Sequence, residues 1–569
     1  MRYGRSSCIT VTLASRRRPV IRRKEPPNGR LHRRQPQGGR RPGAEVRPLP
    51  AARDADGARR ARSRELRDQL PADRTRLPVA VRAQAQESGG DLRPLGRKRS
   101  DQARGRSGRP EAVRRRARRE GHDAGLRGRA RGGGADRYRG SQHRARRRGH
   151  RARLVELALE LFPDTAAVED GALSIGGVRA TELASEHGTP LVVYCRETIV
   201  AQARAFRAID PEALVAFGVK AFPNVALLRL LRGEGLGADV STLGELEFAL
   251  HAGLRGEELL FHGNNKSDEE LTAAAAAGAL VVLDSAEEVG RAAGAGARRV
   301  LLRLTPGIKA RTHQSIQTAH DDSKFGVDLD GALGVLRDAL DVLEPIGLHV
   351  HIGSQLARVD ESLLAVDRLA AFCRRCRDEL GWTPQLVDLG GGPGIRHSLD
   401  ERVPPPHEFA RALVERLRGE WPEPARVALE PGRSLVGRAG VTLYRIGATK
   451  RSGGVEYAAI DGGMSDNPRP QLYGARYAAR LANRDGPPEG EFRIAGKHCE
   501  SGDVLLGRVA LPRPRRGDLL AVPATGAYTL AMASNYNGVP RPAAVLVAGG
   551  EATVIRRRET VDDLLALEA

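Results

Sequence analysis

Eight strand-like runs of apolar residues, separated by helical patterns, dominate the middle of this sequence. They span residues 215–220, 236–240, 259–262, 280–284, 300–304, 347–352, 386–389 and 427–430. Three of the helical segments begin with a Ser or Thr followed three residues later by Glu, the capping-box pattern of a helix start: Thr242/Glu245, Ser267/Glu270 and Ser285/Glu288. Strands and helices that alternate in this number predict an α/β fold built on a closed (β/α)8 barrel. An open doubly wound sheet is the alternative.

The position of the polar residues favours the barrel. A polar residue or a glycine run stands at or near the carboxyl end of each predicted strand: Lys220, Asp239, His262, Asp284, Arg303, His351, glycines 390–392 and Glu430. Barrel enzymes place their chemistry at this rim. We therefore expect a functional site where these strands end.

The two flanks of the barrel differ from it in composition. After about residue 441, short strand-like pieces with Gly and Pro between them predict a C-terminal β domain: residues 455–460, 492–494, 519–522, 544–547 and 552–555. Residues 166–178 form a predicted hairpin around Asp170 and Gly171. We predict that an N-terminal segment, residues 151–188, joins the β domain of residues 441–569, which leaves residues 189–440 for the barrel.

Residues 1–150 have the composition of a disordered extension. They hold 44 Lys and Arg against 14 Asp and Glu, or +30, whereas residues 151–569 hold 49 against 56, or −7, so the net charge of +23 arises in the first quarter. This Arg-, Gly- and Pro-rich stretch has two aromatic residues and no apolar periodicity, and it cannot form a core. We interpret it as a mis-assigned start in preference to an uninvolved tail or an RNA-binding tail, and expect no nucleic-acid partner.

The cysteines and the apolar runs indicate the cellular compartment. Five Cys without regular spacing cannot form a disulfide framework. Cys373 and Cys376 lie in a helical stretch without a second pair, so we predict no metal site. No apolar run approaches the roughly 18 residues of a membrane helix, and the N-terminus is too short in apolar residues for a signal peptide. A cytoplasmic location without a membrane partner is expected.

Three features of the rim predict one cofactor. Lys220 ends an apolar strand, where burial would hold its amine partly neutral for Schiff-base chemistry. The glycines at 390–394 can present N–H groups to a phosphate. Glu430 and Arg433 place a carboxylate and a guanidinium on the same rim. Each feature alone is weak, because lysines cap strands and glycines make tight turns; together they indicate pyridoxal phosphate.

From about Leu154 to Ala569 the chain resembles the diaminopimelate decarboxylases, pyridoxal-phosphate enzymes of the alanine-racemase-like barrel class, whose fold ornithine decarboxylases share. The matching stretches follow one another in the family's order: VKA (219–221), FHGNNKS (261–267), SKFG (323–326), HVHIGSQ (349–355), DLGGG (388–392), EPGRS (430–434), DGGMSDNPRP (461–470), CESGD (499–503) and SNYNG (534–538). The resemblance implies decarboxylation of meso-2,6-diaminopimelate to L-lysine and CO2.

The resemblance also implies roles for the cofactor residues. Lys220 would hold pyridoxal 5'-phosphate covalently, Glu430 would bind its ring nitrogen and His351 would lie against its ring face. The phosphate would be bound by Gly391, Gly392 and Ser354, and Tyr528 would reach the cofactor from the β domain.

The remaining implied residues concern the substrate and a second subunit. Arg433, Arg469 and Tyr473 would bind the substrate's distal carboxylate; for Arg469 the alternative is a surface loop. In the family, Cys499 and Glu500 enter the neighbouring subunit's site, as proton donor and as contact to the distal amino group, which implies a homodimer.

Rival functions share parts of this pattern. The alternatives are a decarboxylase of ornithine, arginine or carboxynorspermidine, a racemase, a non-catalytic cofactor carrier and an RNA-binding protein. The stretches 461–470 and 499–503 favour a substrate with two charged ends.

Overall fold

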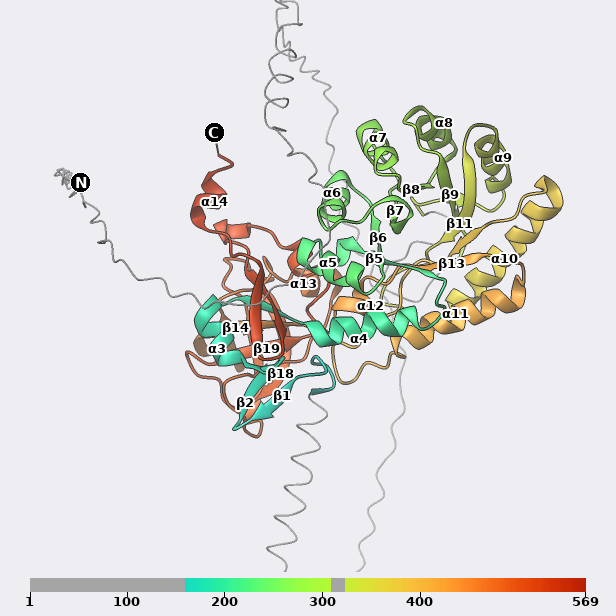
Figure 1. Ribbon diagram of the computed structural model, residues 1–569. Coiled ribbons are helices and arrows are strands. Elements are labelled where there is room, and N and C mark those ends of the chain that lie inside the picture. Colours follow the sequence, from blue (N-terminus) through green and yellow to red (C-terminus); the bar gives the residue numbers. More distant parts are fainter. Residues whose placement is uncertain (1–158, 309–322, 569) are drawn as a thin grey trace, which may run out of the picture. The chain divides into compact units, whose positions relative to one another are not determined.

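The structure is a computed structural model that describes residues 159–308 and 323–568 (Figure 1). These residues belong to one compact unit. The predicted disordered extension, residues 1–150, lies outside the described residues. Among the described helices, none is both long and apolar enough to cross a lipid bilayer.

Eight parallel strands form a closed barrel, as predicted. Each strand pairs with the next along the chain, and the last, β13, pairs with the first, β5. The strands are β5 (Leu214–Gly218), β6 (Gly237–Val240), β7 (Leu259–Phe261), β8 (Leu280–Leu283), β9 (Arg299–Thr305), β11 (Glu344–Val350), β12 (Leu386–Asp388) and β13 (Arg426–Leu429). An open doubly wound sheet has two edges, so the β13–β5 pairing excludes it.

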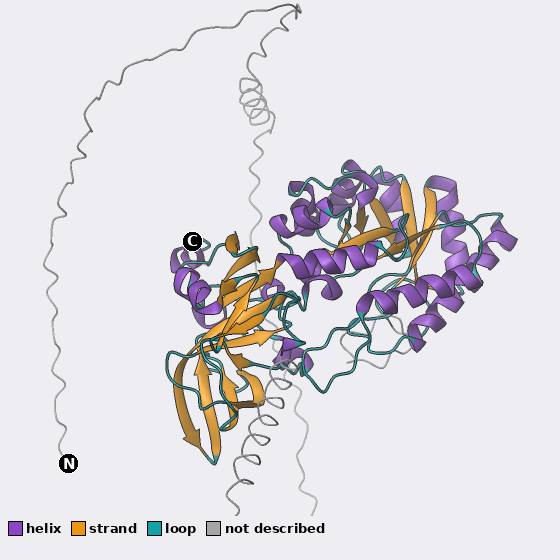
Figure 2. Ribbon diagram, turned by 60° about the horizontal axis from the view of Figure 1, so that its bottom comes forward, coloured by secondary structure: helices purple, strands orange, loops and turns teal. Residues whose placement is uncertain are grey.

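Alternating residues along the barrel strands face two different cores. Leu214 and Ala216 of β5 belong to the small cluster inside the barrel, whereas Val215 and Phe217 belong to the large cluster under the helices. This period of two is what a strand covered on both faces requires. Figure 2 shows the helices outside the strands.

The covering helices are α4 (Arg196–Arg207), α5 (Val225–Gly233), α6 (Leu243–His251), α7 (Asp268–Ala276), α8 (Ala286–Gly294), α9 (Ala332–Val342), α10 (Asp360–Leu380) and α11 (Pro406–Glu420). Two of the predicted helix starts are capped by the predicted residue: Thr242 accepts from Glu245 N, and Ser267 with Glu270 makes a full capping box. Ser285 makes no side-chain cap, and the Glu288 carboxylate, which a capping box would turn back to Ser285 N, binds Lys266.

A β domain stands beside the barrel. Its sheet runs in the order β18-β17-β15-β14-β4-β20-β21, with β19 and β16 on a branch from β14. The strands are β4 (Leu191–Cys195), β14 (Gly440–Ser452), β15 (Val455–Ile460), β16 (Arg480–Leu481), β17 (Gly490–Ala495), β18 (Val504–Leu511), β19 (Leu519–Pro523), β20 (Ala543–Ala548) and β21 (Glu551–Arg556). Strand β4 follows the boundary predicted at residue 188, yet it pairs with β14 and β20 in this sheet.

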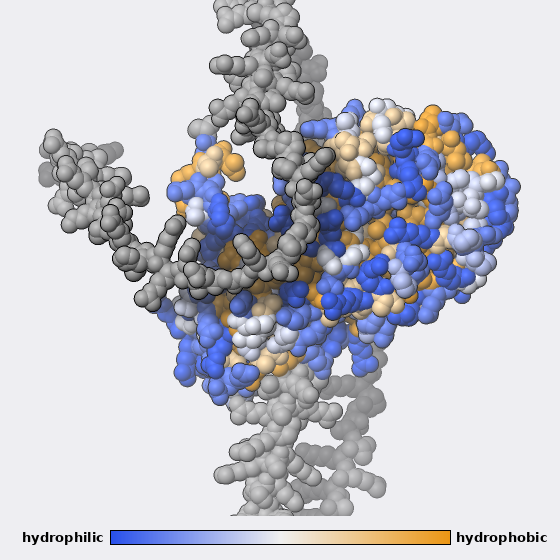
Figure 3. All heavy atoms as spheres, in the orientation of Figure 1, coloured by the Kyte–Doolittle hydropathy of each residue, from blue (hydrophilic) through white to orange (hydrophobic). Residues whose placement is uncertain are grey.

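The predicted N-terminal hairpin is present. Strands β1 (Ala167–Glu169) and β2 (Ala172–Ile175) pair antiparallel around Asp170 and Gly171, which both have positive φ, and β3 (Val178–Arg179) adds a third strand. Leu173 and Ile175 pack in a cluster with residues of β4, β14 and β20. On the face shown in Figure 3, hydrophilic and apolar residues are interspersed over the barrel helices.

Candidate active site

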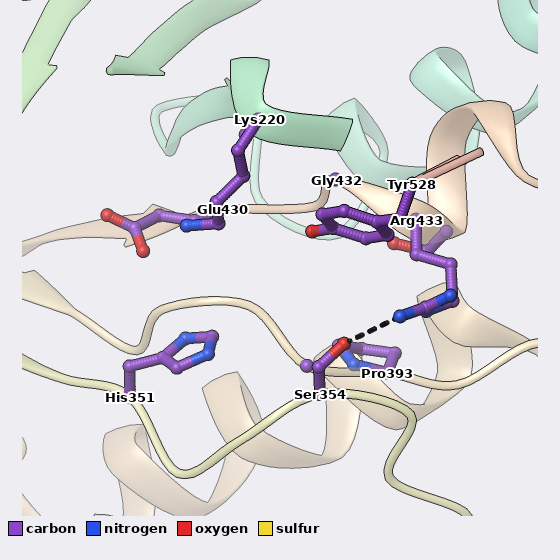
Figure 4. A pocket seen from close by; sticks show the side chains of 11 residues that line it. Lys220, His351, Ser354, Pro393, Glu430, Gly432, Arg433 and Tyr528 are labelled. Atoms are coloured by element: carbon purple, nitrogen blue, oxygen red, sulfur yellow. Dashed lines mark hydrogen bonds between the residues drawn. The ribbon is translucent and has the colours of Figure 1, made fainter. Parts of the chain in front are cut away.

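A pocket of about 400 Å³ lies at the carboxyl ends of the barrel strands, within the size range of small-molecule sites. Residues from barrel strands, from the loops after them and from the β domain line it, and they include Lys220, His351, Ser354, Glu430, Arg433, Tyr473 and Tyr528. In Figure 4, Lys220, Glu430 and Tyr528 lie on one side, with His351 and Ser354 across from them. The rim predicted from the strand ends is thus a pocket.

Lys220 follows β5 in a single 3-10 turn, η1 (Val219–Ala221), and points into the pocket. Its Nζ lies 3.1 Å from Asp239 Oδ2, and its side chain is 49% exposed. Burial lowers the pKa of this amine, but the charges of Asp239, Tyr528 and Glu430 outweigh burial and raise it above its ordinary value. The expectation of a partly neutral Lys220 amine is therefore wrong for the chain without bound cofactor, because Asp239 on the neighbouring strand β6 supplies a carboxylate.

Glu430 is buried between two histidines just past β13. Its Oε1 lies 2.5 Å from His262 Nε2, and its Oε2 lies 3.4 Å from His349 Nε2. Burial alone would raise the pKa of Glu430, but His262 and His349 hold it well below its ordinary range, while burial and the Glu430 charge raise the pKa of Asp388. Glu430 is thus the ionised carboxylate of the pair. Glu430 lines the pocket, so its carboxylate can accept a hydrogen bond from a protonated ring nitrogen.

The same buried group has a second chemical capacity. One donor atom from each of His262, His349, Asp388 and Glu430 lies within 4.8 Å of the others, a set that could also hold a metal ion. Since His262, His349 and Glu430 line the pocket, any such ion would share its floor.

His351 is a neutral ring with a defined tautomer. Gly391 N lies 3.1 Å from His351 Nδ1 and donates to it, so the proton of the neutral ring is on Nε2. Burial, together with the charges of Lys220 and Arg303, lowers the pKa of His351 well below its ordinary value. A flat uncharged ring in the pocket wall suits contact with an aromatic cofactor.

The glycine run after β12 packs against backbone at distances that exclude side chains. A Cβ on Gly391 would stand 2.3 Å from Glu430 O, and one on Gly392, whose φ is +113°, would stand 2.5 Å from Gly353 O. Gly392, Ser354 and Ser434 line a smaller cavity of about 50 Å³, which shares Lys220, Ser354 and Glu430 with the pocket and forms its glycine end; there, backbone and hydroxyl groups can meet an anion. This end fits a phosphate, and the pocket as a whole fits pyridoxal phosphate.

Tyr528 joins the β domain to the lysine turn. It has a positive φ of 59°, and its backbone N donates to Ala221 O at 2.9 Å. Its phenol lines the pocket, and the Arg433 guanidinium lies 4.7 Å from its ring centroid. Backbone strain at a pocket residue is typical of functional sites.

The three residues predicted to bind a distal carboxylate are placed differently. Arg433 and Tyr473 line the pocket. Arg469, the first residue of α13 (Arg469–Tyr473), is 4% exposed and is not among the lining residues. Arg469 is thus not a surface arginine. Burial and the positive charge of Arg469 together lower the pKa of Arg433 to about 10.

Cys499 and Glu500 do not join the pocket of their own chain. Both are exposed in the loop between β17 and β18. The loop is braced from below: Asp503 Oδ2 accepts from His498 Nδ1 at 2.6 Å, and Asp503 Oδ1 accepts from Met464 N at 2.8 Å. The two predicted side chains are therefore presented outward on a fixed loop.

Several pocket residues were not assigned from the sequence: Ser241, Gly263, Lys324, Phe325 and Met532 line it, together with Arg303, whose guanidinium lies 4.5 Å from the Phe325 ring. Arg303, Asp239 and His262 carried a signal, because they stand at strand ends. His349 of β11, two residues before His351, lies in the matching stretch 349–355, but no role was assigned to it.

Comparisons with known proteins agree on one group. The family model "Pyridoxal-dependent decarboxylase, pyridoxal binding domain" matches residues 196–437. Diaminopimelate decarboxylase of Actinosynnema pretiosum subsp. auranticum is 44% identical over 436 residues, 73% of this chain and 97% of that protein. The Bacillus subtilis (strain 168) enzyme of that name is 42% identical over 430 residues, 70% of this chain and 96% of that one.

Solved structures of the same name also match. The Helicobacter pylori diaminopimelate decarboxylase complexed with L-lysine is 30% identical with a TM-score of 0.64, covering 68% of this chain and 98% of that one. A lysine/ornithine decarboxylase from Vibrio vulnificus, 23% identical with a TM-score of 0.58 over 64% of this chain and 96% of that one, shares the fold.

Proposed function

This chain belongs to the diaminopimelate decarboxylase family, and we propose that its barrel-rim pocket is where it converts meso-2,6-diaminopimelate to L-lysine and CO2. The enzyme is a pyridoxal-phosphate-dependent decarboxylase. The observation that carries the assignment to this pocket is the meeting of the Lys220 amine, the Glu430 carboxylate and the glycine end in one cavity. We propose residues 189–440, without strand β4, for the cofactor half and residues 441–569, with 151–188 and β4, for the half that completes the site.

When bound, pyridoxal phosphate supplies an electron sink for the pair released as CO2 leaves. Lys220 would attach the cofactor and must first give up a proton, for which Asp239 is the adjacent acceptor at 3.1 Å. Glu430, ionised and flanked by His262 and His349, would keep the ring nitrogen protonated.

The other cofactor residues would orient the cofactor and enclose it. The neutral His351 ring would pack on the cofactor face without adding charge. Gly391, Gly392 and Ser354 would bind the phosphate; Gly392 and Ser354 line the cavity, whereas Gly391 N donates to His351 Nδ1 and would have to exchange that acceptor for the phosphate. Tyr528 would close the pocket from the β domain, where its backbone N donates to Ala221 O.

For the substrate, Arg433, Arg469 and Tyr473 would bind the distal carboxylate, since guanidiniums pair with carboxylates in fixed geometry. Several guanidinium N–H groups are buried without a hydrogen-bond partner: Arg433 Nε and Nη1 and Arg469 Nε. Buried unpaired donors are costly, and a carboxylate would satisfy them.

Cys499 and Glu500 would serve the site of a second subunit. They are exposed, on a braced loop and outside their own pocket, as residues supplied across a two-fold interface must be. Cys499 would donate a proton to the reacting carbon, and Glu500 would contact the distal amino group. The active form would then be a homodimer, and the free cysteines are consistent with the cytoplasm.

The direct test is incubation of purified protein with meso-diaminopimelate and pyridoxal phosphate, with L-lysine and CO2 assayed together. Ornithine, arginine and carboxynorspermidine serve as competing substrates. Faster turnover of any of these three would contradict the assignment.

A further inference from the structure

Arg469 is held from behind by two side chains that have no assigned role. Its Nη1 lies 3.0 Å from His397 Nε2 and donates to Tyr477 Oη at 2.5 Å. His397 lies in the loop between β12 and α11, Tyr477 follows α13, and both are buried. The His397 and Tyr477 rings also meet edge to face, with centroids 5.3 Å apart.

The hydrogen-bond pattern fixes the state of His397. A guanidinium can only donate, so His397 Nε2 must accept and the proton must lie on Nδ1. Glu401 Oε2 lies 3.7 Å from that Nδ1 and also accepts from the His397 backbone N at 2.6 Å. Gln355 Nε2 lies 3.4 Å from Nδ1, but it is a donor and makes no hydrogen bond to a protonated Nδ1; it donates instead to Ile395 O at 2.5 Å, while Gln355 Oε1 accepts from Ile395 N.

A charged ring at His397 would stand beside two guanidiniums. Burial lowers the pKa of His397 to about 4; Arg469 and Arg433 contribute in the same direction, against the opposing effect of Glu401. The ring is therefore neutral near pH 7.

A neutral anchor leaves the arginine's charge intact. Among the described residues, Arg469 makes no ion pair with a carboxylate; its Nη1 is used by neutral groups, and its Nε is buried without a hydrogen-bond partner. An acidic anchor would orient Arg469 equally well but would compensate its charge and weaken its attraction for an incoming carboxylate. The Nε–H of Arg469 is thus a buried donor that no described residue uses, and it is the group that a carboxylate ligand would satisfy.

We propose that His397 and Tyr477 are positioning residues that fix Arg469 through uncharged hydrogen bonds and so set the preference for ligands that carry a distal carboxylate. This inference rests on the proposed function of Arg469. It predicts an effect on the carboxylate end of the ligand alone, because neither His397 nor Tyr477 lines the cofactor pocket.

The test uses the holoenzyme and two ligands that differ by one group. L-lysine carries the carboxylate that remains after decarboxylation, and cadaverine is the same molecule without it. The ratio of their dissociation constants, measured by calorimetry, reports the distal carboxylate without turnover; the KM for meso-diaminopimelate is measured in parallel.

We expect His397→Leu and Tyr477→Phe each to weaken L-lysine binding about fivefold, the effect of about 1 kcal/mol for one hydrogen bond. Cadaverine affinity and kcat should stay within about twofold of the starting enzyme. His397→Gln keeps a neutral acceptor and should restore binding, whereas His397→Glu adds a compensating charge and should not.

Matched controls separate the possible failures. Tyr457→Phe removes a hydroxyl that accepts from Arg493 at 3.2 Å outside the pocket, and should change neither ligand. If Arg469→Met leaves the ligand ratio unchanged, the role of Arg469 fails and this inference with it. If Arg469→Met abolishes the preference and His397→Leu does not, or if His397→Leu weakens cadaverine equally, the positioning role alone is wrong.

Discussion

The barrel pocket and the Cys499 loop, which we propose to act in one site, differ in how their polar side chains are used. In the pocket, charges are buried and matched within one chain: Lys220 faces Asp239, and Glu430 stands between His262 and His349. In the loop, the buried Asp503 carboxylate binds His498 of the same loop, whereas the side chains of Cys499 and Glu500 are exposed. The difference supports the proposal that Cys499 and Glu500 act in the site of a second subunit.

Loss of the pocket's amine is the largest expected effect. Lys220→Ala should remove the visible absorbance of bound pyridoxal phosphate and reduce kcat by about a thousandfold or more, because a nucleophile that acts as part of a unit is not replaced by its neighbours. Borohydride reduction of the starting enzyme followed by peptide mapping should label Lys220. Label on another lysine would show that the pocket is assigned wrongly.

Mixing two inactive variants tests whether Cys499 of the loop acts in the site of the second subunit. Cys499→Ala and Lys220→Ala, after free subunit exchange, should recover about a quarter of the original activity, since half the dimers are mixed and each holds one intact site. A tagged partner verifies exchange. No recovery after proven exchange would mean that Cys499 serves its own chain.

Removing the brace should damage the loop and spare the pocket. Asp503→Asn replaces one acceptor oxygen with a donor that opposes the donors of His498, and should cost about 1–3 kcal/mol of unfolding free energy. We expect lower kcat with unchanged cofactor absorbance. A loss of absorbance instead would show that the two regions are not separable.

Acid should weaken the pocket side through its neutral histidines. Burial lowers the pKa of His349 and of His397 to about 4 in the folded chain, against 6.5 as the ordinary value. The unfolded chain therefore takes up more protons as pH falls from about 6.5 to about 4, so unfolding free energy falls over that window, by at most about 3 kcal/mol per histidine. Urea unfolding at pH 7 and pH 4.5 measures it, and His397→Gln should flatten the decline.

Deleting residues 1–150 should have the smallest effect. The pocket and the loop both lie within the described residues beyond 158, so kcat, KM and cofactor absorbance should stay within about twofold, the range of surface changes away from a site. The truncated and full chains are compared side by side. A misfolded or inactive truncation would assign these residues a structural part.

The sequence predicts what depends on local pattern and misses what depends on long-range pairing. The barrel strands are found because apolar runs mark strands covered on both faces. Strand β14 is missed because half of it is exposed and polar, and β4 was assigned to the barrel because its pairing with β14 joins residues far apart in the chain. Glu288 matches a capping box, yet the buried Lys266 amine takes it instead.

The site shows the same division. Lys220, His351 and Glu430 were predicted from strand ends and motifs, and all three line one pocket. The protonated state of Lys220 was not predicted, because it depends on the charge of Asp239 on the neighbouring strand. Nor could the sequence show that His397 lies behind Arg469, because those residues meet only once the β domain packs on the barrel.

The backbone link from Tyr528 to Ala221 has a consequence for how the molecule comes apart. It connects the β domain to the turn that carries Lys220. Local opening of the β domain breaks this link before the barrel strands separate, so the lysine turn loses its support early. The β domain should therefore open in a step before the barrel melts, and a proteolytic fragment containing the barrel alone would keep its strands while Lys220 loses its fixed position.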